Sequence, residues 1–352
     1  MHPAKAVAAQ SVVKVLPKSS IDVTINFNLI NALLPMTTTR PSTSIVNPHI
    51  SKSATLNRAK HLSNAVSLAL PTVLVIFLLL GTSTTWVPSV FSLFLGAVFF
   101  ICISMGLGVG FHRHFTHHAF KTSAVGKAIL AILGTWSLQG PIVSWVADHR
   151  RHHRFADQQY DPHSPWVDDS GKIDNRLAGW FHAHVGWKFK VAVSDENRYV
   201  PDLLKDPVVM FVSRHYWAIA IAGLLAPGAL GYVYGGRDEC LTCLLWAGGV
   251  RAILLHQFEG IANSITHLFG TKVDGSQDES RNNLWLTVVL MGEGLHSYHH
   301  QNATMAVNQP AKFDAFGHFL LLSEKLGWVW DLRKAKKPVD VQTVRPIPAG
   351  LA

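Results

Sequence analysis

Residues 149–153 read His-Arg-Arg-His-His, with histidines at positions i, i+3 and i+4. These positions share one face of an α-helix, and neutral imidazole is the side chain that most often binds metal ions. The same spacing recurs in residues 296–300, and a looser pair, His112 and His117, lies upstream. Eight imidazoles are too many for one ion, so the pattern predicts a site for two metal ions.

The composition is that of a membrane protein. The chain has 352 residues, of which 48% are hydrophobic and 15% are charged, and its net charge is +9. It is therefore more apolar and less charged than a typical soluble domain. The basic balance fits Lys and Arg in cytoplasmic loops, and no basic-aromatic motif of an RNA- or DNA-binding fold is present. We expect a lipid bilayer as the partner, and no nucleic acid.

Four apolar segments have the length that a bilayer crossing needs. They lie at 66–86, 89–111, 216–234 and 240–262. We expect the third to bend near Pro227. Lys and Arg gather before the first segment and after the last, so the positive-inside rule places the histidine motifs in the cytoplasm.

The expected fold is therefore an all-α integral membrane protein with four transmembrane helices. A helical cytosolic cap, built from residues 112–207 and 263–335, would hold the metal site. The apolar insert at 128–138 is too short to cross a bilayer, and we expect it to be interfacial or re-entrant.

The remaining regions are predicted to be tails. Residues 1–60 are basic and rich in Ser, Thr, Asn and Pro, so we expect a disordered N-terminal tail. This segment lacks the pattern of a secretory signal. It is either a flexible tail or a stretch upstream of a true start at Met36, and both interpretations stay open. The predicted membrane domain covers 61–335, and residues 336–352 form a C-terminal tail.

The fourth apolar segment carries the charged residues Arg251 and Glu259. A charge at the centre of a bilayer costs about 2.5–3.5 kcal/mol on the insertion scale, so such residues usually face the interior of a helix bundle. Two interpretations remain open. The residues form a structural ion pair two turns apart on one helix face, or they line the path of the substrate.

Two further residues extend the possible ligand set. Asn263 and His267 are separated by four positions, so they share one helix face. His267 adds a ninth imidazole, and Asn263 can hold a metal-bound water through its amide.

Ligand type narrows the choice of metal. Nitrogen ligands suit iron, zinc or copper. Zinc is redox-silent and would imply a hydrolase, but the chain has no lipase-like Gly-x-Ser-x-Gly motif. Two irons beside a bilayer imply oxygen chemistry on a lipid tail.

Six segments carry a resemblance to a known family. They are Gly-Phe-His-Arg-His-Phe-Thr-His at 110–117, Trp-Val-Ala-Asp-His-Arg-Arg-His-His at 145–153, Asp-Pro-His-Ser-Pro at 161–165, His-Val-Gly-Trp at 184–187, Asn-Ser-Ile-Thr-His at 263–267 and Gly-Glu-Gly-Leu-His-Ser-Tyr-His-His at 292–300. In this order and spacing they resemble the integral-membrane fatty acyl desaturases of the stearoyl-CoA (delta-9 acyl-CoA) type and their bacterial relatives. The resemblance runs from about residue 65 to 335.

The resemblance implies a four-helix membrane stem under a cytosolic cap with a di-iron centre. The implied ligands are His112, His117, His149, His152, His153, His267, His296, His299 and His300, with Asn263 acting through water. The implied reaction removes two hydrogens from a saturated acyl chain, using O2 and two electrons, and yields a cis double bond and water. It implies no catalytic residue beyond the ligands, and we see no flavin or nicotinamide site.

Two carboxylates adjoin the implied ligands. Asp148 and Glu293 could accept N–H bonds from imidazoles and so orient them, or they could be ordinary capping or surface carboxylates. His163 and His184 match family positions outside the ligand set. They contact the ligands or the head group of the substrate, or they are structural histidines.

Other aromatic residues are more ambiguous. Trp145 and Trp187 line the substrate path or are ordinary interfacial tryptophans. His114 and His118 stand in the first motif, at positions that are often not histidine in relatives, and we interpret them as bystanders.

The resemblance also implies partners. We expect an acyl-CoA or acyl-lipid substrate, and a separate electron donor of the ferredoxin or cytochrome b5 type because the chain shows no His-Pro-Gly-Gly element. We favour the bacterial inner membrane over the endoplasmic reticulum. Two alternatives remain: a membrane di-iron hydroxylase and, remotely, a metal transporter, whose ligands would be expected at mid-bilayer. The position of the double bond, the chain length and the carrier of the acyl group stay open.

Overall fold

The computed structural model describes residues 47–81, 86–309 and 313–335. The predicted C-terminal tail and most of the predicted N-terminal tail therefore lie outside the described residues. Within the described chain, helices dominate, as predicted. The β-structure consists of two antiparallel pairs, in which β1 (Lys121–Thr122) pairs with β4 (Val329–Trp330), and β2 (Val167–Asp168) pairs with β3 (Gly171–Lys172).

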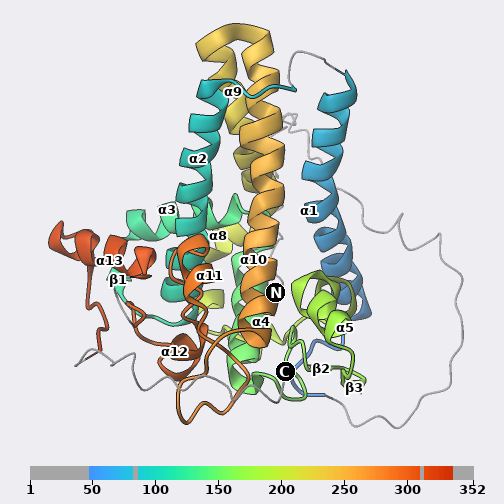
Figure 1. Cartoon of the computed structure of the whole chain (residues 1–352), viewed down its shortest axis with the longest axis vertical. Helices are drawn as coiled ribbons and strands as arrows, with labels where there is room; N and C mark the ends of the chain where they lie inside the picture. The colour runs from blue at the N-terminus through green and yellow to red at the C-terminus, as the bar shows by residue number, and fades with distance from the viewer. Residues whose placement is uncertain (1–46, 82–85, 310–312, 336–352) are drawn as a thin grey trace, which may run out of the picture. The chain divides into compact units, whose positions relative to one another are not determined.

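Three helical stretches in the described part of the chain are long and apolar enough to cross a membrane. They are α1 (Ala54–Gly81), then α2 (Val90–Met105) with the π-helix η2 (Gly106–Thr116), and finally α9 (Tyr216–Cys243) with η5 (Leu244–Val250) and α10 (Arg251–Leu268). In Figure 1 α1, α2, α9 and α10 run along one another. α2 packs against α9 and η5, and α1 packs against η5 and α10.

The third stretch reverses direction within α9. Gly235 and Gly236 have non-helical backbone angles, and Gly236 has φ of 75°, which glycine adopts without steric strain. Beyond them the chain runs back along α9 (Figure 1), so that a Cβ atom added to Gly248 would lie 2.8 Å from the carbonyl oxygen of Leu224. The reversal lies in the gap between the third and fourth predicted segments, 216–234 and 240–262, and Pro227 lies inside the helix. The break occurs at the glycine pair, where no side chain opposes the positive φ.

Much of the apolar surface of these helices faces outward. In α1, Phe77 and Leu80 are 69% and 84% exposed, and the buried residues of this helix are Ser67, Pro71 and Leu78. Water would oppose such an exposed apolar face, whereas lipid tails would cover it without a hydration penalty. The outward faces therefore agree with a membrane location.

The other helices lie between and after the long stretches. They are α3 (Ala124–Thr135), α4 (Ile142–Phe155), α5 (Arg176–Phe181), η3 (His182–Gly186), α6 (Trp187–Lys190), α7 (Glu196–Tyr199), η4 (Leu203–Lys205), α8 (Pro207–Arg214), α11 (Leu284–Val289), α12 (His296–Gln301) and α13 (Ala315–Lys325). Side-chain caps fix several of their starts. Ser123 accepts a bond from the N–H of Gly126 at the start of α3, and Asp206 caps α8 just before a proline at the first helical position.

The π-helix η2 lies at the centre of the packing. It contacts α2, α3, α4 and α13. Phe111 of η2 belongs to one buried apolar cluster with residues of α4 and α8, among them Val146 of α4. Val109 of η2 belongs to a second cluster with residues of α13, among them Phe316. These two clusters hold η2 from two sides and so set the position of the histidines that it carries.

Glycine allows α3 to lie directly on η2. A Cβ atom added to Gly106 would lie 2.2 Å from the backbone nitrogen of Gly134, well inside van der Waals contact. The predicted interfacial insert at 128–138 is thus largely helix α3, which is too short to span a bilayer and packs on η2.

This contact predicts that Gly106→Ala destabilises the protein. The added methyl group has no space against the backbone of α3, and overpacking of this kind typically costs about 1–3 kcal/mol. Thermal unfolding of the purified protein in detergent measures the effect. Gly81→Ala is the control, because nothing lies within 4 Å of a Cβ atom at Gly81. Equal melting temperatures for the two variants would contradict the packing argument.

Candidate metal centre

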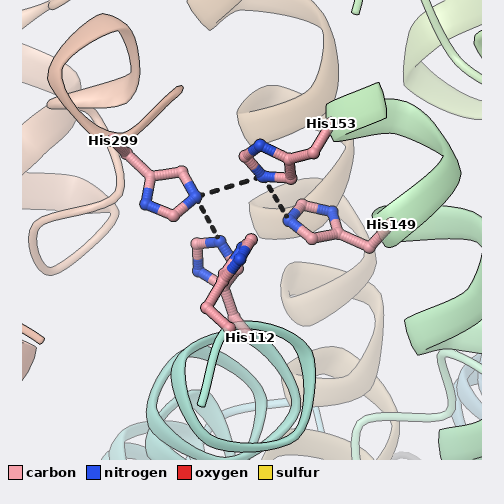
Figure 2. A group of neighbouring side chains, drawn as sticks. His112, His149, His153 and His299 are labelled. Atoms are coloured by element: carbon pink, nitrogen blue, oxygen red, sulfur yellow. Dashed lines mark hydrogen bonds between the residues drawn. The ribbon is translucent and has the colours of Figure 1, made fainter. Parts of the chain in front are cut away.

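The structure brings the nine predicted histidines together in two groups. One group contains His112, His117, His149, His153 and His299, and the other contains His152, His267, His296 and His300. In each group, one ring nitrogen per residue lies within 4.8 Å of the others. Four members of the first group are labelled in Figure 2.

The two His-x-x-His-His motifs lie on helices, as their spacing predicts. In α4 the Nε2 atoms of His149 and His153 are 3.1 Å apart, and in α12 those of His296 and His300 are also 3.1 Å apart. His152 turns to the second group while its neighbour His153 turns to the first. One helix thus contributes to both groups, which explains why three histidines are needed in each motif.

A π-helix aligns the looser pair. His117 donates its backbone N–H to the carbonyl oxygen of His112 at 3.2 Å, a bond that spans five residues. The bond belongs to the wider turn of a π-helix, a rare geometry that is frequent at functional sites. It places the two rings side by side, with centroids 5.0 Å apart. On an ordinary α-helix, residues five positions apart would not share a face.

The reactive nitrogens point inward. His299 Nε2 lies 2.9 Å from His112 Nε2 and 3.2 Å from His153 Nε2 (Figure 2). His117 Nε2 is buried and has no hydrogen-bond partner among the described residues. A buried polar nitrogen without a partner is costly, and a metal ion among the converging nitrogens would satisfy it. The residues therefore fit a metal ion in each group.

Carboxylates hold the opposite nitrogens of four rings. The Nδ1 atoms of His152, His267 and His300 lie 2.8 or 2.9 Å from carboxylate oxygens. The partners are Asp161 for His152, Asp157 for His267, Asp278 for His300 and, at 2.8 Å, Glu293 for His112. A carboxylate that accepts the Nδ1–H leaves the lone pair on Nε2, which then faces the metal site.

Burial keeps six of the imidazoles uncharged. Burial, and then the neighbouring imidazoles, holds the pKa well below the usual value of histidine for His117, His149, His152, His153, His296 and His299. A neutral imidazole keeps the lone pair that a metal ligand requires. The site is therefore ready to bind a cation at neutral pH without first releasing protons from these rings.

The carboxylates of Glu293 and Asp278 have lowered pKa values. Burial alone would raise the pKa of Glu293, but its contacts with His112 and Arg113 outweigh burial and bring that pKa to about 2. The pKa of Asp278 is also lowered, because its hydrogen bond from His300 outweighs burial. Ionised carboxylates are stronger acceptors than neutral ones, so they hold the imidazoles firmly.

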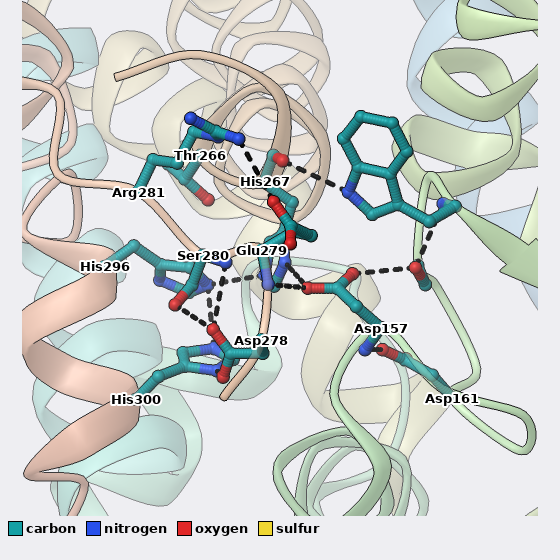
Figure 3. A network of polar contacts seen from close by, with 12 residues as sticks. Asp157, Asp161, Thr266, His267, Asp278, Glu279, Ser280, Arg281, His296 and His300 are labelled. Carbon is teal, nitrogen blue, oxygen red and sulfur yellow. Dashed lines mark hydrogen bonds and ion pairs between the residues drawn. The ribbon is translucent and has the colours of Figure 1, made fainter. Parts of the chain in front are cut away.

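Two loops close the second group. Asp157 Oδ2 accepts both the Nδ1–H of His267, at 2.9 Å, and the backbone N–H of Glu279, at 2.8 Å (Figure 3). The backbone N–H of Arg281 donates to the carbonyl oxygen of Thr266 at 2.7 Å. The bond from Glu279 ties the loop that follows α10 to the turn that follows α4, and the bond from Arg281 ties the same loop to the end of α10.

Sequence analysis missed two of these carboxylates. Asp157 and Asp278 belong to no motif, and their only signal was a position near the histidine motifs. Asp161 was part of a matching segment but had no assigned role. Glu293 contacts His112 as expected. Asp148 does not contact an imidazole: it accepts bonds from Lys60 and Ser194 at 2.8 and 2.7 Å, so that expectation was wrong.

Of the remaining predicted histidines, one lies against a member of the second group and the others lie outside both groups. His163 stacks on His152 with ring centroids 4.1 Å apart, and it forms a third possible ligand group with His152 and Asp161. His184 contacts Ser264 and Gln257, so it lies outside both groups. His118 is exposed and pairs with Asp202. Neither His118 nor His114 enters a group, as expected for bystanders.

A cavity of about 50 Å³ adjoins the histidines. Its lining includes His112, His149, His296, Asn263 and Trp145, together with Leu107, Gly108, Phe258, Glu259, Ala262 and Glu293. The indole of Trp145 stacks on His149 with ring centroids 5.0 Å apart. Asn263 therefore lies where a water could join it to a metal ion.

The other residues proposed for the substrate path lie away from this cavity. Trp187 is buried against His163 and does not line it. Arg251 donates to the carbonyl oxygens of Ala247 and Gly223 at 2.8 and 3.2 Å, and it borders a separate groove of about 500 Å³ between α2 and α10. The possible ion pair between Arg251 and Glu259 is therefore not formed.

Comparisons with known proteins agree with this geometry. The profile of the fatty acid desaturase family matches residues 55–314. The chain is 40% identical to the hex-5-enoyl-[acyl-carrier protein] acetylenase of Moorena producens, over 65% of this chain and 73% of that protein. It is 32% identical to the sn-1 stearoyl-lipid 9-desaturase of Anabaena variabilis, over 63% and 76%. It is 27% identical to stearoyl-CoA desaturase 4 of Mus musculus, over 74% and 73%.

The carboxylate contacts predict that Asp161→Asn weakens metal binding. The amide cannot carry the negative charge that accepts the His152 Nδ1–H, and loss of such a partner typically lowers metal affinity about 10–100-fold. Titration of the metal-free protein with Fe²⁺ under anaerobic conditions measures this. Asp174→Asn is the matched control, because the Asp174 side chain is 83% exposed and pairs with Lys172. Unchanged affinity in Asp161→Asn would show that the carboxylate does not support a ligand.

Proposed function

The chain belongs to the fatty acid desaturase family, and we propose that it forms a double bond in a fatty acyl chain at a centre of two iron ions. The observation that carries the proposal is the convergence of two groups of buried imidazoles beside a cavity. Two bound irons would supply the oxidising power that amino-acid side chains lack. The acyl chain gives up two hydrogen atoms, that is, two protons and two electrons. With two further electrons from a donor and two protons, these reduce O2 to two waters.

The ligand assignment follows the two groups. The first iron is held by His112, His117, His149, His153 and His299, and the second by His152, His267, His296 and His300, with Asn263 acting through water. Asn263 supports this assignment because it lines the same cavity as His296 and the second group has one imidazole fewer.

The residues of the chain have distinct tasks in this reaction. The carboxylates Asp157, Asp161, Asp278 and Glu293 hold the rings in one tautomer through their Nδ1 atoms. Burial of the site excludes bulk water, which strengthens electrostatic interactions and prevents side reactions. Trp145 forms the cavity wall next to His149 and would guide the acyl chain past the first group.

The relatives differ in the carrier to which the acyl group is attached. The relatives are named for an acyl-carrier protein, a lipid and a CoA thioester. These names support a fatty acyl substrate, while the expected delta-9 position on acyl-CoA is one option among several. A separate electron donor of the ferredoxin or cytochrome b5 type completes the proposal.

We also propose four membrane crossings. α1 and α2 provide two, and the reversal at Gly235 and Gly236 divides the third long stretch into two more. An even number of crossings puts the histidine-bearing segments on one side, and Lys and Arg near the ends of the long helices favour the cytoplasmic side. The residues at 112–207 and 263–335 would then form the cap, at the inner membrane of a bacterium.

Product analysis tests the reaction. A desaturase-deficient host that expresses the chain should contain new unsaturated acids by gas chromatography–mass spectrometry, and His153→Ala should abolish them because a ligand of the first iron is lost. His114→Ala is the control, since His114 bonds to the carbonyl oxygen of Phe120 outside both groups. Hydroxylated acids would instead identify a hydroxylase. Iron-loaded protein with no product in a host that supplies donors would contradict the proposal.

The topology has its own test. A reporter that fluoresces only in the cytoplasm should be bright when fused after residue 335 and dark when inserted at Gly236, between the third and fourth crossings. A periplasmic reporter should give the opposite pattern. Two reporters on the same side would show that α9 and α10 do not each cross the membrane.

A further inference from the structure

A buried ion pair lies on the wall of the histidine cavity. Two carboxylates line this cavity, and Glu293 is directed to His112. The other, Glu259, contacts none of the nine histidines. Its Oε2 atom is 2.8 Å from Lys188 Nζ, and its Oε1 atom accepts the indole N–H of Trp145 at 2.7 Å. A pure hydrocarbon tail needs no such charges on its path.

The pair belongs to a continuous polar network. Lys188 Nζ also donates to Gln139 Oε1 at 3.0 Å, and Gln139 Nε2 lies 3.0 Å from His256 Nδ1. His256 Nε2 lies 3.2 Å from the carbonyl oxygen of Ser67 on α1. All four of the side chains Lys188, Glu259, Gln139 and His256 are buried. Each of these side chains has a hydrogen-bond partner, so the network holds all four in place on the wall of the cavity.

Glu259 lines the cavity on the part of α10 that precedes the site residues Asn263 and His267. Glu259 precedes Asn263 by one helical turn and His267 by two, which corresponds to about 12 Å along the axis of α10. It therefore stands between the histidines and the apolar part of the helix. On the same part of the wall, Phe258 packs edge-to-face with Phe100 at a centroid distance of 6.1 Å. An aromatic ring and a paired carboxylate thus line the cavity side by side in the sequence of α10.

A long hydrocarbon tail would conflict with this wall. Charges that have lost water are stabilised only by good partners, and an apolar chain that separated Glu259 from Lys188 would leave both charges buried without compensation. A short acyl chain would end before it reached the pair and would leave the pair intact.

We propose that the Glu259–Lys188 ion pair ends the acyl path and makes this protein selective for short acyl chains. The inference rests on the proposed function, because it names the class of substrate for the same site. Glu259 and Lys188 are then residues that determine specificity. They lie apart from the metal ligands, so their effect is on chain length and not on iron binding.

The test compares chain lengths in one host. Cells of the desaturase-deficient host are fed octanoate or stearate, so that the host attaches the carrier that the protein requires, and unsaturated products are measured by mass spectrometry. Wild type should favour the octanoyl chain by at least about tenfold, a typical discrimination for a pocket that excludes methylene groups. The double variant Glu259→Leu, Lys188→Met removes both charges together, so neither is left unpaired. It should shift the ratio toward the stearoyl chain by at least about tenfold.

A matched control removes another ion pair. Lys127→Met with Asp206→Asn breaks the pair between α3 and the start of α8, outside the cavity, while the asparagine can still cap α8. This variant should keep the wild-type ratio. A wild type that prefers stearate, with no change of ratio in the double variant, would overturn the inference.

A second readout does not depend on turnover. Octanoate should raise the melting temperature of the purified wild-type protein more than stearate does, because only ligand that fits the native cavity stabilises the fold. The opposite order would overturn the inference, even if the double variant failed to fold. An iron-loaded protein that makes no product from either acid, yet shows the expected melting order, would count against desaturation while supporting the short-chain cavity.

Discussion

Burial of nine imidazoles at one place is the constraint on which the rest of the structure depends. Each ring has two nitrogens, and a buried nitrogen without a partner is costly. The structure resolves this by giving the two nitrogens different tasks. In four of the rings the Nδ1 atom contacts a carboxylate, while Nε2 atoms converge at distances such as 2.9 Å between His112 and His299. A metal ion in each group would complete the arrangement, because it satisfies the inward nitrogens at once.

This constraint explains the unusual backbone around the site. His112 and His117 can serve one group only because η2 is a π-helix, and η2 in turn is held by direct backbone contact with α3 at Gly106 and Gly134. Larger side chains at these glycines would push α3 away and release the turn that carries both histidines. The geometry of the metal site in this protein therefore depends on how closely the apolar helix α3 packs on η2.

The polar network that reaches from Trp145 to Ser67 connects the site to the long helices. It joins α4, α6 and α10 to α1 through side chains that are buried and paired. Such networks are stable only when every member is satisfied, and they then define one arrangement of the elements that they join. The same bonds place charge on the wall of the cavity, so the rigidity of the interior and the shape of the acyl path have a common origin.

Local spacing was enough to determine part of this protein from sequence. Histidines at i, i+3 and i+4 share a helix face whatever surrounds them, so 149–153 and 296–300 could be placed on helices, and the apolar runs could be identified as long helices by length and composition. Other features depend on residues far apart in the chain, and tertiary structure alone decided them. Asp157 and Asp278 meet their histidines only through folded loops, Asp148 turns to Lys60, and Glu259 pairs with Lys188 instead of Arg251. The reversal at Gly235 and Gly236, by contrast, lies in the gap that the sequence left between 216–234 and 240–262, because the turn needs the positive φ that glycine adopts most easily. Spacing along a helix is a property of the sequence, but the choice of partner for a buried charge depends on which elements the fold brings beside it.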